Sequence, residues 1–386
     1  MWLTLLFGAT ACLFLMMTFS AMFHLRWARR LPALRDLPTE DRPDGSPAPR
    51  CSVVVAACDE ESRIERTVQI LLAQLEVETE VIVVDDRSVD RTGEILQRLS
   101  AVDQRLRVIR VSALPEGWLG KCHACHVGAG TVTGDWILFT DADCWLKPDA
   151  IARALRVAAR DRADHVTLTP GVVPSSPAAR AWHLAFLITV ADWISGVNRD
   201  RPQRFLGVGA FNLVRTSAYR ECGGYELLRL TVLDDVKLGL LLRRAGKRTR
   251  AFIGGDDTEC HWGNTMRGMI QVMEKNYFAA VDYRTSAAVG VGLGGPLLWA
   301  IALIGPWTGT GAGIVAGIAL LSLAIPAGIL ARRLAWPMGS AMLTPFVFPL
   351  LFYAMLNSVW VTVRQGGVRW RETFYPLDQL RAGNLR

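Results

Sequence analysis

Three long stretches of the sequence carry no Asp, Glu, Lys or Arg, and they constrain the fold more than any other feature. They are residues 1–25, 286–331 and 334–363. A helix needs about 20 apolar residues to cross a bilayer. The first stretch therefore predicts one spanning helix, and the second predicts two with a turn near Pro306–Gly313. The third predicts one tilted span or a broken hairpin, because it contains Pro337, Pro345 and Pro349.

Composition supports a chain that lies partly in lipid. Hydrophobic residues make up 51% of the sequence and charged residues only 20%, whereas soluble domains average about 25% charged residues. This balance excludes a disordered chain, a disulfide-stapled mini-protein and a collagen-like fibre. A helix buried in a soluble core is the alternative for each uncharged stretch, but stretches of this length favour the membrane.

The first stretch, residues 1–25, predicts an N-terminal transmembrane anchor. A cleaved signal peptide is the alternative, but the stretch has no basic n-region and is longer than the usual apolar core of about 7–15 residues. A cluster of arginines follows it at positions 26, 29, 30 and 35. Because cytoplasmic segments carry the excess of Arg and Lys, we expect a multi-pass protein of a bacterial-type inner membrane whose middle part is cytoplasmic.

Residues 286–363 are expected to hold the C-terminal membrane segments. If three segments crossed here, the Arg-rich tail at 364–386 would lie outside, against the same charge tendency. We therefore expect a cytoplasmic tail, with one Gly- or Pro-rich segment that lies in the interface or re-enters. The small basic excess, 43 Lys and Arg against 36 Asp and Glu, fits anionic lipid, and no nucleic-acid-binding motif accompanies it.

Residues 51–260, after a basic and Pro-rich linker at 26–50, alternate predicted strands with predicted helices. Buried strands are predicted at 51–57, 80–86, 106–111 and 136–140, and helices at 61–76, 92–99 and 121–133. This alternation indicates an α/β fold with a mostly parallel, Rossmann-like sheet. The eight scattered cysteines fit a reducing compartment and require no disulfide framework.

Acidic residues follow three of the predicted strands. They are Asp59-Glu60, Asp85-Asp86 and Asp141-Ala-Asp143. Ligands of such sheets bind outside the carboxyl ends of the strands, and a divalent cation that bridges to phosphate, Mg²⁺ or Mn²⁺, would balance the acids. An Asp-x-Asp pair by itself is often a solvated turn. However, the first strand lacks the glycine patterns of dinucleotide and P-loop sites, which leaves a nucleotide-sugar site.

These residues resemble a family-2 glycosyltransferase with the GT-A fold. The motifs that carry the resemblance are Val53-Val-Val-Ala-Ala-Cys-Asp59-Glu60, Val81-Ile-Val-Val-Asp85-Asp86-Arg-Ser-Val-Asp90-Arg-Thr, Gly134-Asp-Trp-Ile-Leu-Phe-Thr-Asp141-Ala-Asp143 and Leu233-Asp234-Asp235-Val-Lys-Leu-Gly239. They occur in the order typical of the family. The first departs from the usual Pro-x-x-Asn-Glu continuation of the opening strand.

A finer resemblance extends over nearly the whole chain to membrane-bound members, such as the hopene-associated glycosyltransferases and, more distantly, the ceramide and carotenoid glycosyltransferases. It is carried by Gly117-Trp-Leu-Gly-Lys121-Cys-His, Gly223-Gly-Tyr-Glu, Glu274-Lys-Asn-Tyr-Phe-Ala and Trp370-Arg-Glu-Thr-Phe-Tyr. Residues 261–276 lack the Gln/Arg-x-x-Arg-Trp pattern of processive synthases, which disfavours polysaccharide synthesis.

The resemblance implies a role for each candidate residue. Asp235 would be the catalytic base, although Asp234-Asp235 before an apolar run would also serve to cap a helix. Asp143, with Asp141, would hold the metal.

The nucleotide-sugar would be bound by Glu60, Asp86, Lys121, Asp141, Gly209 and Asp234. Lys121 would pair with a phosphate, or else is a solvated surface lysine. Gly207–Asn212 would flank the donor sugar, or else is a strand with a bulge.

Three further features have weaker interpretations. Cys122-His-Ala-Cys-His126 has zinc-like spacing, but neighbouring residues of a helix point about 100° apart, so four convergent ligands are not expected. His261 is either a site residue or an interfacial one. Residues 261–285 have an amphipathic pattern, which indicates either core packing or an interfacial helix that leads into the next span.

The sequence and its family resemblance thus predict a membrane-anchored inverting glycosyltransferase. It would transfer a sugar from a UDP-linked donor to a lipid hydroxyl with the help of a divalent metal, in glycolipid or hopanoid biosynthesis. Three alternatives stay open. They are transfer to a polyisoprenyl phosphate, synthesis of a polysaccharide, and a non-catalytic membrane scaffold that binds nucleotide sugar.

Overall fold

The computed structural model describes residues 1–37, 49–173, 176–261, 265–371 and 373–385. The chain forms two compact units. The helical unit comprises Met1–Ala28, Val172–Ser195 and Trp262–Arg381, and the sheet unit comprises Arg29–Gly171, Gly196–His261 and Ala382–Arg386.

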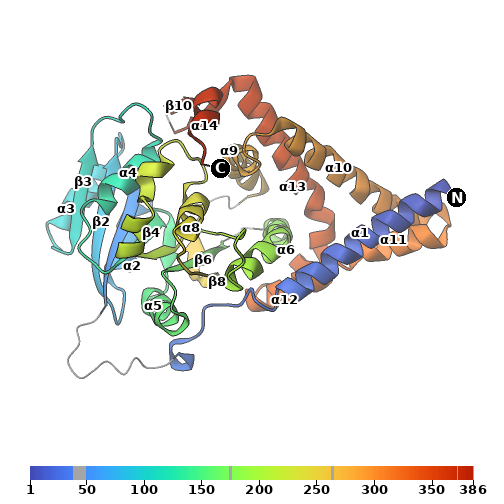
Figure 1. Cartoon of the computed structure of the whole chain (residues 1–386), viewed down its shortest axis with the longest axis horizontal. Coiled ribbons are helices and arrows are strands. Elements are labelled where there is room, and N and C mark those ends of the chain that lie inside the picture. The colour runs from blue at the N-terminus through green and yellow to red at the C-terminus, as the bar shows by residue number, and fades with distance from the viewer. Residues whose placement is uncertain (38–48, 174–175, 262–264, 372, 386) are drawn as a thin grey trace. The chain divides into compact units, whose positions relative to one another are not determined.

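The sheet unit contains an eight-stranded sheet in the order β3-β2-β1-β4-β7-β6-β8-β5 (Figure 1). Its parallel part consists of β1 (Arg50–Ala57), β2 (Glu78–Asp86), β3 (Leu106–Val111) and β4 (Trp136–Asp141). These strands form because short β-branched runs such as Val53-Val-Val are buried on both faces. The four strands predicted from the sequence are therefore present, within two residues at each end.

The helices between these strands are α2 (Ile64–Leu72), α3 (Thr92–Ser100) and α4 (Gly120–Ala129), and α5 (Ala150–Asp161) comes after β4 along the chain. Two are shorter than predicted, since α2 begins only after a turn at 61–63 and α4 ends before Gly130. Helix α4 packs closely on the sheet, where a Cβ on Gly128 would lie 2.6 Å from Val54 Cγ1.

The other part of the sheet contains antiparallel pairs and was not predicted in detail. It consists of β5 (Cys144–Leu146), β6 (His165–Val172), β7 (Asn212–Arg215) and β8 (Thr249–Cys260). Strand β7 pairs antiparallel with both β4 and β6, and β5 pairs antiparallel with β8. Helix α8 (Asp234–Arg244), which carries the predicted base, precedes β8.

Among the residues that the structure describes, the helical unit contains four stretches that are long and apolar enough to cross a membrane. They are Trp2–His24, Thr285–Thr308, Gly311–Arg333 and Met338–Gln365. They correspond to α1 (Trp2–His24), α10 (Thr285–Ile304) with a short 3-10 turn, α11 (Gly311–Leu321) with α12 (Ala324–Arg333), and α13 (Met338–Gln365) (Figure 1). The break predicted near Pro306–Gly313 lies between Thr308 and Gly311. The third uncharged stretch forms one helix, with Pro345 and Pro349 inside it.

Three smaller parts complete the helical unit. Helix α9 (Met266–Ala280) lies within the predicted amphipathic segment, and its N-terminus is capped by the Thr265 side chain. Helix α6 (Pro177–Asn198) contributes its residues up to Ser195. After α13, the tail forms a hairpin of β9 (Gly367–Trp370) and β10 (Thr373–Pro376), followed by α14 (Leu377–Gly383).

Candidate active site

The sheet register brings the acidic strand ends together. Ala56 near the end of β1 pairs with Asp141 on β4, and Ala57 pairs with Asp85 on β2. Asp86 is the last residue of β2, and Asp143 lies shortly after the end of β4. Glu60 lies shortly after the end of β1, the strand between these two. Parallel pairing places all three carboxyl ends at one edge of the sheet, which is the edge where α/β proteins bind ligands.

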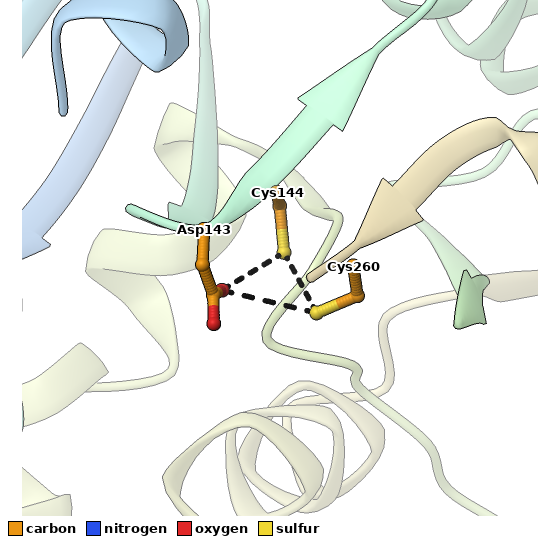
Figure 2. A group of neighbouring side chains, drawn as sticks. All are labelled: Asp143, Cys144 and Cys260. Carbon is orange, nitrogen blue, oxygen red and sulfur yellow. Dashed lines mark hydrogen bonds between the residues drawn. The ribbon is translucent and has the colours of Figure 1, made fainter. Parts of the chain in front are cut away.

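Asp143 lies between β4 and β5 and is surrounded by other acids. Burial, together with the negative charges of Asp141 and Glu60, raises the pKa of Asp143 to about 6. Its Oδ1 atom faces the thiols of Cys144 and Cys260, at 3.6 and 3.8 Å (Figure 2). A partly buried carboxylate in this acidic surrounding would gain stability from a cation, and oxygen donors are those that Mg²⁺ and Mn²⁺ prefer. The residues present therefore fit a divalent metal.

Lys121, at the start of α4, lies among three acids. Its Nζ atom is 2.6 Å from Asp141 Oδ1 and 3.9 Å from Asp234 Oδ2. Burial alone would lower the pKa of Lys121, but the charges of Asp141, Asp234 and Asp235 raise that pKa well above its ordinary value. Lys121 is therefore a charged partner of site carboxylates, and only 21% of its side chain is exposed.

Asp235 lies in the first turn of α8 and has two contacts that fix its carboxylate. The Gly209 N–H donates to Oδ2 at 2.6 Å, and the Val236 N–H donates to Oδ1 at 2.8 Å. Burial and the charge of Asp234 raise the pKa of Asp235 to about 6, although Lys121 and the Val236 N–H act in the opposite direction. A carboxyl group with this pKa is ionised at neutral pH and can accept a proton.

The segment 207–211 has no regular structure and approaches α8 closely. A Cβ on Gly207 would clash with the Asp235 carbonyl oxygen, and a Cβ on Gly209 would lie 2.7 Å from Asp141 Oδ2. Glycine is required at position 207 because the chain passes directly against the Asp235 backbone, and at position 209 because it passes against the Asp141 carboxylate. Asn212, at the end of this segment, donates from Nδ2 to the Asp235 carbonyl oxygen at 3.4 Å.

Asp86 and Glu60 lie on the β1 and β2 side of the group formed by Lys121 and its acidic neighbours. Both Asp86 oxygens accept from the Arg87 guanidinium, at 2.8 and 2.9 Å. A Cβ on Gly120 would clash with Asp86, which places Asp86 against the residue that precedes Lys121. Glu60 is buried, and its carboxylate lies 3.6 Å from Arg63.

The predicted site residues are thus connected in space, although they come from distant parts of the sequence. Lys121, Asp141, Asp234, Asp235 and Gly209 are linked by direct contacts. Tyr225 was not expected at the site from the sequence, but its hydroxyl donates to Asp234 Oδ2 at 3.0 Å and so positions that carboxylate. The signal was present, because Tyr225 belongs to the Gly-Gly-Tyr-Glu motif.

The segment Cys122–His126, which has zinc-like spacing, contacts other groups in the structure. The Cys122 and Cys125 side chains are buried, and the Cys122 thiol faces the Thr231 carbonyl oxygen at 3.5 Å. The rings of His123 and His126 both pack on Trp118. His261 stacks on Trp145, with ring centres 3.6 Å apart, and its backbone N–H donates to the Asp143 carbonyl oxygen.

Comparison with known proteins finds similarity to glycosyltransferases. Residues 52–223 match the model of glycosyl transferase family 2. The chain is 26% identical over 217 residues to the 4,4'-diaponeurosporenoate glycosyltransferase of Staphylococcus haemolyticus, covering 55% of this chain and 56% of the relative. It is 27% identical over 200 residues to the beta-monoglucosyldiacylglycerol synthase of a Nostoc species, covering 49% and 40%. The matches therefore span about half the length of these relatives.

A solved structure shows the same fold. It is the mannosyltransferase PcManGT of Pyrobaculum calidifontis in complex with GDP-Man and Mn²⁺, with a TM-score of 0.54, 19% identity, and coverage of 93% of this chain and 99% of that protein. The predicted α/β fold of the GT-A type, with apolar helices towards both termini, is confirmed.

Proposed function

We propose that this chain, whose residues 52–223 match the model of glycosyl transferase family 2, transfers a sugar from a nucleotide donor to a lipid hydroxyl with inversion at the anomeric carbon. The observation that carries the proposal is the carboxylate of Asp235. It is fixed by two backbone N–H groups, carries a pKa of about 6 and lies beside the Lys121–Asp141–Asp234 group. A base in this position suits the activation of a hydroxyl nucleophile.

Each site residue then has a chemical role. Asp235 accepts the proton of the acceptor hydroxyl as its oxygen attacks the anomeric carbon. Asp143, with Asp141, would hold a divalent metal, which when bound neutralises the diphosphate leaving group. Asp86 and Glu60 would accept hydrogen bonds from the nucleoside. Lys121 holds Asp141 in place and, through its charge, opposes the rise in the pKa of Asp235.

Lipid as acceptor is supported by two observations. The relatives named above are, by their names, a 4,4'-diaponeurosporenoate glycosyltransferase and a beta-monoglucosyldiacylglycerol synthase. In the described part of this chain, four stretches are long and apolar enough to cross a membrane. Hopanoids are a further candidate acceptor on the grounds of the sequence resemblance. For the donor we propose a UDP-linked hexose, with GDP-mannose as the competing candidate because the solved relative contains it.

We expect membranes that contain the full chain to transfer label from UDP-hexose to lipid in the presence of Mg²⁺ or Mn²⁺. The measurement is thin-layer separation and mass spectrometry of the extracted lipids, with GDP-mannose tested in parallel. A single-sugar product on a neutral lipid supports the proposal. A product on a polyisoprenyl phosphate, a long polymer, or donor binding without any product would each support one of the three alternatives and contradict it.

We also propose a membrane topology in which α13 does not complete a crossing. The end of α12 lies at the end of α1, because Arg333 Nη1 donates to the Leu25 carbonyl oxygen at 2.7 Å and also to that of Ala28. Helix α13 starts five residues later, so it begins on the side of the membrane where α1 ends.

The other end of α13 returns to the segment that precedes α10. The Phe278 N–H of α9 donates to Ser358 Oγ at 2.9 Å, and Lys275 Nζ lies 3.2 Å from the Trp370 ring centre. Arg381 Nη2 donates to the Tyr283 carbonyl oxygen at 3.3 Å. If α10 crosses and α11 with α12 crosses back, both ends of α13 lie on the same side. Helix α13 would then lie in the interface or re-enter, and the Arg-rich tail would be cytoplasmic.

Reporter fusions test this topology. A fluorescent protein that folds only in the cytoplasm should be bright when fused after residue 386, and alkaline phosphatase at the same point should be inactive. Fusions after Thr310, between α10 and α11, should behave in the opposite way and serve as the control. Active phosphatase after residue 386 would show that α13 crosses the membrane.

A further inference from the structure

Two cysteines beside the candidate metal ligand have no role in the proposed transfer. Cys144 on β5 and Cys260 on β8 are direct partners across an antiparallel pair. Their Sγ atoms lie 3.3 Å apart, and both side chains are fully buried (Figure 2). Both thiols point towards the same atom, Asp143 Oδ1, at 3.6 Å and 3.8 Å. One oxygen and two sulfurs therefore form a compact triangle.

The dimensions of this triangle match one face of a tetrahedral zinc site. With Zn–S of about 2.3 Å and Zn–O of about 2.0 Å, tetrahedral angles place two sulfurs about 3.8 Å apart and a sulfur about 3.5 Å from an oxygen. The sulfur–sulfur distance of 3.3 Å is somewhat shorter, and the sulfur–oxygen distances of 3.6 and 3.8 Å are slightly longer. Small side-chain rotations would therefore admit the ion.

We propose that Asp143, Cys144 and Cys260 form a binding site for a thiophilic divalent cation of the Zn²⁺ class. Thiolates select such ions over Mg²⁺ and Mn²⁺, which prefer oxygen donors. On binding, the two thiol protons pass to the solvent, the ion gains two thiolates and one carboxylate, and a fourth position stays open for water. This site differs from the oxygen-rich metal site of the proposed function, but it shares Asp143.

Because both metal sites would use the Asp143 carboxylate, we expect zinc to inhibit sugar transfer. This expectation rests on the proposed function. A zinc-class ion on Asp143 Oδ1 would engage the side chain that should hold the catalytic metal. Micromolar Zn²⁺ should then lower Mn²⁺-supported sugar transfer by about 10-fold or more, since even indirect disturbance of a metal ligand costs about 10–100-fold. Transfer by a Cys144→Ser/Cys260→Ser variant should be insensitive to Zn²⁺.

Binding is tested without any activity measurement. The purified, reduced full-length chain is titrated with Cd²⁺, and thiolate-to-metal absorption in the ultraviolet is followed. We expect one equivalent to bind to the wild type, and the signal to be lost in Cys144→Ser/Cys260→Ser. The matched control, Cys51→Ser/Cys222→Ser, removes two other buried thiols and should keep the signal.

X-ray absorption of the Zn²⁺-loaded wild type needs no variant and should show two sulfur neighbours. A shell without sulfur, a signal that survives in Cys144→Ser/Cys260→Ser, or a Cys144–Cys260 disulfide in the reduced protein would overturn the site. Because these readouts do not involve sugar transfer, an inactive protein that still binds Cd²⁺ through both thiols would contradict the proposed function alone.

Discussion

Asp235→Asn is expected to lower kcat by about 10²–10⁴-fold, the usual contribution of a general base. Asn has nearly the same shape, and its single amide oxygen can still accept one of the two hydrogen bonds that the Gly209 and Val236 N–H groups donate to separate Asp235 oxygens. It is also a good residue for helix N-termini. If Asp235 served only to stabilise the start of α8, the variant would lose some stability but would keep its turnover. The measurement is lipid-product formation at saturating donor, with thermal unfolding of the same preparation.

The matched control is Asp378→Asn, which changes another acid in the first turn of a helix, α14. It should keep wild-type turnover. Full activity in Asp235→Asn would show that Asp235 is not a catalytic base. It would favour a phosphate acceptor, because an acceptor that is already ionised needs no base.

The dependence of kcat/KM on pH is a second test of the role of Asp235. Asp235 must be ionised to accept a proton and its pKa is about 6, so kcat/KM should fall as the pH falls through about 6. The pKa of Asp143 is similar, but at saturating Mn²⁺ a bound cation keeps that carboxyl ionised. Under these conditions the acid limb belongs to Asp235, and Asp235→Asn should remove it.

Asp143→Asn is expected to raise the Mn²⁺ concentration needed for half-maximal activity by about 100-fold or more. Loss of a residue that merely supports a metal ligand already costs about 10–100-fold in affinity, and Asn also removes a negative charge. The same change should leave the fold intact or stabilise it slightly at neutral pH. The raised pKa shows that the ionised carboxylate is disfavoured beside Asp141 and Glu60 in the absence of a cation.

Activity is measured across a Mn²⁺ series, and folding is followed by thermal unfolding without metal. Glu61→Gln is the control, since Glu61 is an exposed acid close in sequence to Glu60 that pairs with Arg91. An unchanged metal requirement in Asp143→Asn would show that this carboxylate does not hold the cation.

The sequence by itself determined the features that depend on local chemistry. Uninterrupted β-branched runs such as Val53-Val-Val determined the parallel strands, because such residues favour extended backbone and burial. The chain positions of Glu60, Asp86 and Asp143 directly after strands determined that these acids share one edge of a parallel sheet. The long stretches without charge determined the apolar helices, since only lipid or a large core can hold them.

Only the tertiary structure decided which distant groups meet. Lys121 and Asp141 lie 20 residues apart and Asp235 lies much further along the chain, so their contacts depend on packing of α4 and α8 rather than on any local pattern. The pairing of Cys144 with Cys260 follows from an antiparallel register that periodicity cannot predict. The return of α13 to α9 depends on hydrogen bonds such as Phe278 to Ser358, because hydropathy measures how apolar a helix is and not where its far end lies.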